Sequence, residues 1–327
     1  MKTLTHNICI LGAGAIGTAL GNVLASKKSL NVTLLSIEKE VIVSITNGHI
    51  NQKYFPNIPL NSRLAATEDP TILRKADIIF LAVPSVVTMD YLLSISDFIP
   101  PSAFLVNLAK GFGNGNKTIT ENLTTAFPNP AFAMKGPSFA RELINNMPTS
   151  FTLAGKNEEL FSVFSDIFKK TPVYLDFSKD VKGVEILSIL KNIYAIVIGI
   201  VDAHFNSPNL RFMVLTKAFN EMKNILLHFG GEEETLFKYC GIGDFGLTAL
   251  NDMSRNRTLG LLIGKGFFTE NISDKVVLEG KIAVNIFTNE IAKNHLDADN
   301  YHIINELNKI FHFNNSIPEF VNNIIKK

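Results

Sequence analysis

A lysine followed by an asparagine, Lys191 and Asn192, interrupts an otherwise apolar stretch that runs from Gly183 to Val201. A helix that is apolar on most sides is buried in the protein, and an ammonium there loses its hydration. This loss lowers the pKa of a lysine toward the range in which it donates and accepts protons near neutral pH. Lys191 is therefore a candidate general acid and base. A lysine that reaches solvent along the edge of a core helix is the alternative.

Small and polar residues share one side of this predicted helix. Steps of three and four residues place side chains on the same helical face. The stripe lies beside Lys191 and predicts one wall of a cleft. Its members are Glu185, Ser188, Asn192, Ala195, Gly199 and Asp202.

A glycine turn and a basic segment in the last third of the chain carry further candidates. The turn at residues 240–243 presents Asp244, and Thr248 follows four residues later. Residues 254–257 then read Ser-Arg-Asn-Arg. Hydrogen-bond donors around a guanidinium suit the oxygens of a phosphate group. An exposed basic turn is the alternative for this segment.

Three glycines near the N-terminus form a second motif. Gly12, Gly14 and Gly17 follow an apolar run and precede a helical segment at residues 18–25. Between a strand and a helix, this spacing is typical of dinucleotide binding. The first glycine permits a tight turn, the second lets the backbone approach a pyrophosphate, and the third allows close packing of helix on strand. An ordinary glycine turn is the alternative.

The choice between NAD and NADP depends on the residues after the second apolar run. These are Ser36, Ile37 and Glu38, and the first basic residue after the run is Lys39. An acid in this place binds the ribose hydroxyls of NAD, whereas an arginine accommodates the 2′-phosphate of NADP. The pattern predicts a preference for NADH over NADPH. Equally, Glu38 could cap the helix that follows.

Three other segments with small residues follow apolar runs, at residues 82–85, 109–112 and 135–140. Open α/β sheets bind ligands at the carboxyl ends of their strands. Lys110 follows such a run and precedes Gly111, which predicts that its ammonium points into the ligand crevice. A solvated loop lysine is the alternative.

The order of the apolar runs predicts the fold class. Continuously apolar strands that alternate with helical segments are typical of a parallel sheet covered on both faces. After residue 180 only helical periodicity remains. We expect an α/β protein with a Rossmann-type, doubly wound parallel sheet over residues 1–180 and an all-helical domain over residues 181–327. The predicted strands lie at residues 7–11, 31–35, 77–83, 103–107, 131–134, 150–154 and 173–175.

Composition narrows the class of partner. The 31 basic and 30 acidic residues give a net charge of +1, which offers no field to recruit nucleic acid or an anionic membrane. The two cysteines, Cys9 and Cys240, show no metal-ligand spacing and fit a reducing cytoplasm. Glu185, Lys191 and Asn192 interrupt the long apolar helix, so we expect no transmembrane segment. Small-molecule partners and no metal are expected.

Together these motifs resemble bacterial NAD(P)-dependent glycerol-3-phosphate dehydrogenases. The family implies a Rossmann domain, a helical substrate-binding domain and an active site between them. It also implies the interconversion of dihydroxyacetone phosphate and sn-glycerol 3-phosphate with NAD or NADP, mainly as a reductase that supplies glycerophospholipid synthesis. We expect a homodimer. Beyond the glycine motif, the matching segments are residues 54–56, 82–85, 110–111, 136–140, 183–185, 190–192, 243–244, 254–257 and 279–280.

The resemblance also implies residue roles. Lys191 would be the general acid and base, Asp244 would orient it, and Lys110 would sit at the substrate carbonyl near the cofactor. Substrate would contact Lys110, Gly136, Ser138, Asn192, Thr248, Ser254, Arg255 and Asn256, with Arg255 on its phosphate. Dinucleotide would contact Gly12, Gly14, Ala15, Ile16, Gly17, Ile37, Glu38, Tyr54, Lys110, Ala140, Arg255, Val277 and Glu279.

Some residues depart from the family pattern. Ile16 stands where an aromatic residue is usual, and Ile37 where an arginine is frequent. Ser188 and Ile189 replace a glycine and a small residue just before Lys191, where they would narrow the site or shift the helix.

Two other functions fit part of the pattern. One is a degenerate relative that binds dinucleotide without catalysis, and the other is a related reductase of another small ketone, such as a keto acid. Lys110, Lys191, Asp244 and Arg255 together argue against the first.

Overall fold

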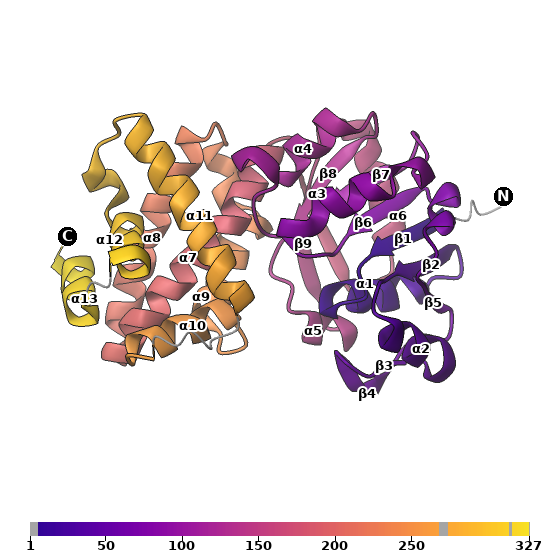
Figure 1. Ribbon diagram of the computed structural model, residues 1–327, viewed down its shortest axis with the longest axis horizontal. Helices are drawn as coiled ribbons and strands as arrows, with labels where there is room; N and C mark the ends of the chain where they lie inside the picture. The colour runs from indigo at the N-terminus through magenta and orange to yellow at the C-terminus, as the bar shows by residue number, and fades with distance from the viewer. Residues whose placement is uncertain (1–5, 268–273, 314–315, 327) are drawn as a thin grey trace. The chain divides into compact units, whose positions relative to one another are not determined.

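The computed structural model describes residues 6–267, 274–313 and 316–326, with the side chains of residues 274–278 and 313 left out. It forms two compact units, Met1–Val181 and Lys182–Lys327. Figure 1 shows the helices and strands of both units.

The first unit is built on one eight-stranded sheet. Its strand order is β10-β9-β8-β7-β6-β1-β2-β5. The six neighbouring strands β8, β7, β6, β1, β2 and β5 are parallel to one another. The α/β fold class is thereby confirmed. The strands are β1 (His6–Leu11), β2 (Leu30–Leu35), β5 (Leu64–Thr67), β6 (Ile78–Leu81), β7 (Phe104–Asn107), β8 (Ala131–Lys135), β9 (Thr149–Ala154) and β10 (Val173–Ser178).

The predicted parallel sheet contains one antiparallel pair, near one edge. Strand β9 runs antiparallel to β8, and β10 pairs parallel with β9. The connection from β8 to β9 contains the five-residue helix α5 (Ala140–Ile144).

All seven apolar runs contain a strand, but three further strands were not predicted. They are β3 (Ile50–Asn51), β4 (Phe55–Pro59) and the edge strand β5. Strand β4 is mostly exposed and contains two prolines, so it lacks the apolar pattern of a buried strand.

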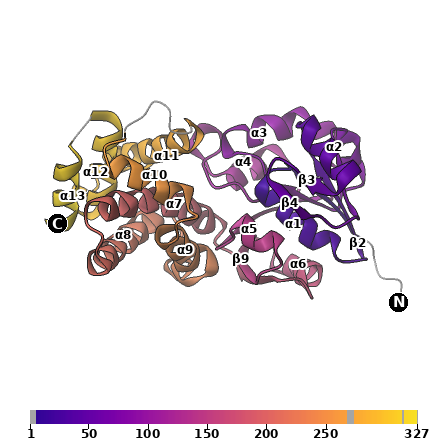
Figure 2. The same ribbon diagram turned by 90° about the horizontal axis from the view of Figure 1, so that it is seen from below.

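Helices cover both faces of the sheet, as Figure 2 shows for α3 and α4 on one side and α5 and α6 on the other. Alternate residues of β1 serve two separate cores, with Ile8 and Ile10 in one and Cys9 and Leu11 in the other. The first core includes α1 (Ala15–Ala25), α2 (Lys39–Gly48), α5 and α6 (Phe161–Phe168). The second includes α3 (Ser85–Ser94) and α4 (Ile119–Ala126).

This topology gathers the candidate loops of the first unit. Strands β1, β2, β6, β7 and β8 point the same way, so the segments that follow them all leave the same edge of the sheet. Strand β1 lies between β2 and β6, which makes the gap between β1 and β6 the switch point where open sheets bind ligands.

The described residues of the second unit form helices and their connections and contain no strand. Helix α7 runs through its middle, with the other helices around it (Figures 1 and 2). By length and composition α7 could cross a membrane, but 94% of its most apolar window is buried inside the protein, as in the core helix of a soluble protein. The helices are α7 (Val181–His204), α8 (Pro208–His228), α9 (Asp244–Leu250), α10 (Arg255–Gly264), α11 (Asp274–Lys293), α12 (His302–Phe313) and α13 (Ile317–Lys326).

The small and polar stripe of α7 is only partly what the sequence predicts. At Gly199 the stripe packs on α10, because a Cβ there would lie 2.9 Å from Gly260 Cα. Asp202 is paired with Arg211 and Arg257. The prediction of a cleft wall is therefore wrong for the second half of the stripe, which is a helix-packing surface.

Candidate functional site

The ammonium of Lys191 is held by two side chains of α9. Lys191 Nζ lies 2.8 Å from Asp244 Oδ1 and donates to Thr248 Oγ1 at 2.7 Å. The Lys191 and Asp244 side chains are only 6% and 1% exposed. The ammonium therefore does not reach solvent along the helix edge. A carboxylate at this distance stabilises the charged amine against the cost of burial.

The glycine turn before α9 determines where Asp244 sits. A Cβ on Gly241 would lie 2.1 Å from Leu236 O, so the short helical turn η6 (Tyr239–Gly243) requires glycine there. Helix α9 begins directly afterwards at Asp244. Asp244 and Thr248 then share one helical face, with 3.5 Å between Thr248 Oγ1 and Asp244 Oδ1.

The start of α10 is joined to the residue next to Lys191. Asn256 Nδ2 donates to Asn192 Oδ1 at 2.8 Å. Ser254 is the N-cap of α10 and accepts a hydrogen bond from the Arg257 amide, while Arg255 is exposed in the first turn. A helix N-terminus with such donors suits an anion. The structure thus connects the predicted substrate residues of α7 with those of α10.

The two arginines of the basic segment have different environments. Arg257 is buried, and its guanidinium lies 2.8 Å from Asp202 Oδ2 and 2.5 Å from Asp252 Oδ1. Asp202 also binds Arg211 Nε at 2.7 Å. Arg257 therefore belongs to an ion network with a buried centre, Arg257 and Asp202, that fixes α10, and Arg255 is the exposed arginine of the segment.

Ser188 and Ile189 do not break the helix that carries Lys191. Helix α7 is continuous from Val181 to His204. The Ser188 hydroxyl donates to Glu185 O at 2.7 Å, within the same helix, and Ile189 is buried. These two side chains are therefore accommodated within a continuous helix.

In the first unit, the glycine motif has the backbone that a pyrophosphate requires. Gly12 has φ +106°, and a Cβ on Gly17 would lie 2.1 Å from Gly12 O. No atom lies within 4 Å of a Cβ built on Gly14, and no side chain caps α1 at that residue. The side of Gly14 that a side chain would fill is open beside a helix N-terminus, so these residues fit a dinucleotide phosphate.

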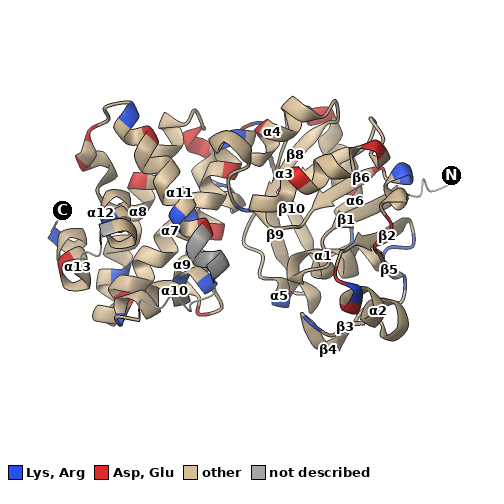
Figure 3. Ribbon diagram, viewed as in Figure 1, with Lys and Arg blue, Asp and Glu red and all other residues tan. Residues whose placement is uncertain are grey.

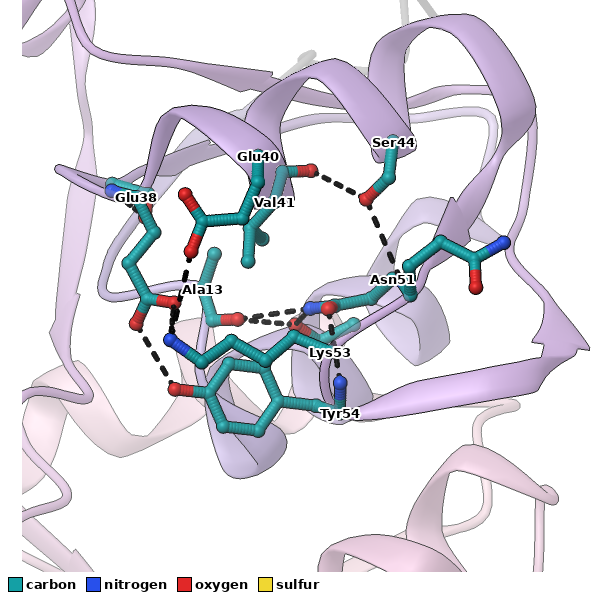
Figure 4. Close-up of polar contacts among 11 residues, drawn as sticks. Ala13, Glu38, Glu40, Val41, Ser44, Asn51, Lys53 and Tyr54 are labelled. Atoms are coloured by element: carbon teal, nitrogen blue, oxygen red, sulfur yellow. Dashed lines mark hydrogen bonds and ion pairs between the residues drawn. The ribbon is translucent and has the colours of Figure 1, made fainter.

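A buried asparagine attaches the β3–β4 hairpin to this turn. Asn51 Nδ2 donates to Ala13 O at 2.9 Å and to Thr18 Oγ1 at 2.8 Å (Figure 4). Asn51 was not among the predicted site residues, because nothing in the sequence around it indicates that its amide is buried.

Glu38 occupies the N-cap position of α2, but its side chain makes no capping hydrogen bond. Its carboxylate instead lies 2.5 Å from Lys53 Nζ and accepts a hydrogen bond of 3.0 Å from the Tyr54 hydroxyl (Figure 4). The hydrogen bond to Glu38 raises the pKa of Lys53. Burial and then the contact with Glu38 raise the pKa of Tyr54. Ile37 beside it is 80% exposed.

Two lysines lie at the ends of β7 and β8. Lys110 Nζ is 3.4 Å from Gly136 O, which also accepts a hydrogen bond of 2.9 Å from the Ser138 hydroxyl. The fully buried Lys135 donates to the carbonyls of Asn107 at 2.9 Å and Ala109 at 2.5 Å. The structure therefore places Lys110, Gly136 and Ser138 together, and Lys135 holds the backbone that leads to Lys110.

The remaining candidates lie on α1, on α5, in the β3–β4 hairpin and on α11. Ala15, Ile16 and Ala140 are half-buried against the first core, as is Tyr54. Glu279 is half-buried on α11, whereas the side chain of Val277 lies outside the described residues. Cys9 and Cys240 are buried free thiols. Within residues 6–267, 274–313 and 316–326, no group of three or more His, Cys, Asp or Glu is arranged to hold a metal ion.

Comparison with known proteins identifies the family. The profile described as NAD-dependent glycerol-3-phosphate dehydrogenase N-terminus matches residues 7–161, and its C-terminal counterpart matches residues 180–322. The chain belongs to the NAD-dependent glycerol-3-phosphate dehydrogenase family.

Relatives within the glycerol-3-phosphate dehydrogenase family match over most of their length. A glycerol-3-phosphate dehydrogenase of Leptospira biflexa, named for NAD(P)+, is 33% identical over 296 residues, which cover 89% of this chain and 88% of the relative. A namesake from Desulfovibrio desulfuricans is 34% identical over 280 residues, 84% of each chain. The crystal structure of the Coxiella burnetii enzyme has a TM-score of 0.90 at 28% identity and covers 99% of this chain and 100% of its own. The resemblance drawn from the motifs is confirmed.

Proposed function

We propose that residues 1–180 bind the dinucleotide, that residues 181–327 bind a phosphorylated ketone, and that Lys191 carries the proton in the reaction. The chain is an oxidoreductase that interconverts dihydroxyacetone phosphate and sn-glycerol 3-phosphate with NAD or NADP. The cofactor supplies the hydride and takes it back in the reverse direction.

Lys191 is assigned the proton transfer because of its contacts. When hydride adds to the ketone carbon, the carbonyl π electrons move to oxygen and an alkoxide develops. The Lys191 ammonium gives its proton to this oxygen, which completes the alcohol and leaves a neutral amine. Asp244 and Thr248 hold the nitrogen at 2.8 and 2.7 Å and so fix its orientation. In the reverse direction the amine removes the alcohol proton.

Lys110 is assigned to the carbonyl oxygen as a second positive charge. Its ammonium lies at the carboxyl end of β7, on the sheet edge that also carries the glycine motif. A cation that is already in place when negative charge develops stabilises the transition state. Gly136 and Ser138, at the neighbouring strand end, complete this part of the substrate site.

The phosphate is assigned to the first turn of α10. Arg255 is exposed there, Ser254 and Asn256 supply polar neighbours, and Asn256 is joined to Asn192. Binding the phosphate orients the reacting carbon and contributes energy that does not come from the reacting atoms.

The dinucleotide is assigned to the glycine motif and its surroundings, with Glu38 on the ribose and NAD preferred. We assign the remaining predicted contacts, Ala15, Ile16, Ile37, Tyr54, Ala140, Val277 and Glu279, to the same cofactor. Reduction of dihydroxyacetone phosphate for glycerophospholipid synthesis in the cytoplasm, by a homodimer, completes the proposal.

The buried contact between Lys191 and Asp244 carries this proposal, and one assay tests it. Oxidation of NADH and NADPH is followed with dihydroxyacetone phosphate and with a panel of unphosphorylated ketones that includes a keto acid. We expect rapid oxidation with dihydroxyacetone phosphate alone. Tight NADH binding without oxidation would indicate a degenerate binding protein, and a faster reaction with a keto acid would indicate another substrate.

A further inference from the structure

The acid assigned to the ribose is paired with a cation that lies close to it in space. Lys53 Nζ lies 2.5 Å from Glu38 Oε2 and 3.7 Å from Glu40 Oε1. The Tyr54 hydroxyl donates to the other oxygen of Glu38 at 3.0 Å. Figure 4 shows Lys53 and Tyr54 reaching the same carboxylate from the hairpin that follows α2. The residues next to Glu38 in the sequence therefore do not show that a lysine lies beside its carboxylate.

Hydrogen bonds fix this hairpin to the dinucleotide motif. Besides its contacts with Ala13 and Thr18, Asn51 accepts a hydrogen bond of 3.2 Å from the Tyr54 amide. Gln52 N donates to Ser44 Oγ of α2 at 3.4 Å. Lys53 thus has neighbours on both sides that are tied to the glycine turn or to α2. Its position next to Glu38 is set by the backbone and does not depend on the ion pair alone.

The Lys53 side chain is exposed enough to reach a second partner. It is 49% exposed, and it contacts the carboxylates of both Glu38 and Glu40. A 2′-phosphate beside Glu38 would be repelled by the carboxylate, because like charges at short range are unfavourable. An ammonium that moves from the carboxylate to the phosphate removes this repulsion and adds a charge-assisted hydrogen bond.

We infer that Lys53 determines cofactor specificity by binding the 2′-phosphate of NADP, while Glu38 binds the ribose hydroxyls of NAD. The inference rests on the proposed function in placing the adenosine ribose at Glu38. It predicts that one site accepts both cofactors. With NAD, Lys53 stays paired with Glu38, and with NADP the Lys53 ammonium moves from Glu38 to the 2′-phosphate.

Lys39 provides a matched control. It follows Glu38 directly in the sequence and has the same charge, but its ammonium faces Glu68 at 3.7 Å and its side chain is 79% exposed. If closeness to Glu38 in sequence or general positive charge determined the affinity for NADP, Lys39 would affect NADP binding as strongly as Lys53.

Binding to the full chain is measured by isothermal titration calorimetry with NAD+, NADP+, 5′-AMP and adenosine 2′,5′-bisphosphate. We expect Lys53→Met to weaken binding of NADP+ and the bisphosphate about tenfold, the loss of one charge-assisted hydrogen bond. NAD+ and 5′-AMP should bind as before or more tightly. Lys53→Arg should retain NADP+ binding, and Glu38→Gln should weaken NAD+ while strengthening NADP+. Lys39→Met should change neither cofactor.

An equal loss for both cofactors in Lys53→Met, or no loss for either, would overturn the inference. So would an equal effect of Lys39→Met on NADP+. Because these measurements need no substrate, they remain decisive if the chain fails to oxidise NADH with dihydroxyacetone phosphate. Thermal unfolding of each variant shows whether the fold is intact, and Lys53→Arg keeps the test valid if Lys53→Met unfolds.

Discussion

Lys191 Nζ and Asp244 Oδ1 lie 2.8 Å apart, although the two residues are 53 positions apart in the sequence. Both side chains are almost fully buried, and Thr248 Oγ1 is the second partner of the amine. A buried ion pair is expensive to form and rarely adds net stability compared with apolar residues. Its presence in the core helix α7 supports the proton transfer that we propose for Lys191.

Asp244→Asn tests whether the carboxylate sustains Lys191. The change leaves the buried ammonium without its charge partner, so we expect the free energy of unfolding to fall by about 3 kcal/mol. We expect kcat to fall on the order of 100-fold, because the amine is no longer held in the orientation for proton transfer. Urea unfolding and steady-state NADH oxidation measure the two effects. Thr248→Val, which removes a neutral hydrogen bond, should cost about 1 kcal/mol. Wild-type kcat in Asp244→Asn would exclude the positioning role.

Arg255→Ala and Arg257→Ala separate phosphate binding from folding. Arg255 is exposed, so its loss should leave the free energy of unfolding unchanged. We expect it to lower kcat/KM for dihydroxyacetone phosphate about 10- to 100-fold and to leave unphosphorylated dihydroxyacetone unaffected. Arg257 lies in the buried network with Asp202, so Arg257→Ala should lower the free energy of unfolding by about 3 kcal/mol or more. Equal losses for both ketones in Arg255→Ala would remove Arg255 from the phosphate site.

The sequence predicted what depends on local pattern. Continuous apolar runs identified seven strands, because a strand buried on both faces needs apolar residues at every position. The glycine spacing identified the turn at Gly12, since the backbone there has positive φ and close neighbours. Lys191, Asp244 and Thr248 were all singled out, and the structure brings them together.

What the sequence did not predict depends on contacts between distant segments. The direction of β9 shows only in its pairing with β8. The edge strand β5 has only four residues, of which Leu64 alone is buried, and this is too short for a recognisable pattern. Lys53 was missed because only the folded hairpin brings it to Glu38. The stripe on α7 was misread because the small residue Gly199 serves equally well for a ligand or for a neighbouring helix.

Lys135→Met tests whether a buried lysine supports the loop of Lys110. The Lys135 ammonium satisfies the carbonyls of Asn107 and Ala109. A methionine fills similar space but leaves these groups unsatisfied, so we expect a loss of about 1 to 3 kcal/mol in the free energy of unfolding. We also expect kcat/KM for dihydroxyacetone phosphate to decrease. Lys110→Met is the matched comparison, because it should reduce activity with little effect on unfolding. Wild-type stability and activity in Lys135→Met would disprove that Lys135 supports the loop of Lys110.

The raised pKa of Glu221 makes the free energy of unfolding depend on pH. Its carboxylate accepts hydrogen bonds from the Ile303 and Ile304 amides, at 2.8 and 2.7 Å, and from the Tyr194 hydroxyl at 2.8 Å. Burial raises its pKa from 4.5 to about 7, against these hydrogen bonds, which lower it. Between these two values the folded chain retains a proton that the unfolded chain has lost. The contribution of Glu221 to stability is thus fully present below 4.5 and is lost as the pH rises through about 7.

Urea unfolding of wild type and Glu221→Gln across this pH range measures the effect. We expect the wild-type free energy of unfolding to decline by a Glu221 contribution on the order of 3 kcal/mol, and the variant to lack that decline. The exposed Glu319→Gln on α13 should behave as wild type. The same decline in Glu221→Gln would assign the pH dependence to another group.

Lys191→Met gives the most direct test of the proton transfer. The substitution keeps an unbranched side chain of similar length and removes the amine. We expect kcat for dihydroxyacetone phosphate reduction to fall on the order of 1,000-fold or more. Calorimetric binding of dihydroxyacetone phosphate and NADH should persist. Tyr194→Phe, which removes a buried hydrogen bond from the same helix, should stay close to wild-type activity. Near wild-type turnover in a folded Lys191→Met would contradict the assignment of Lys191 as the general acid.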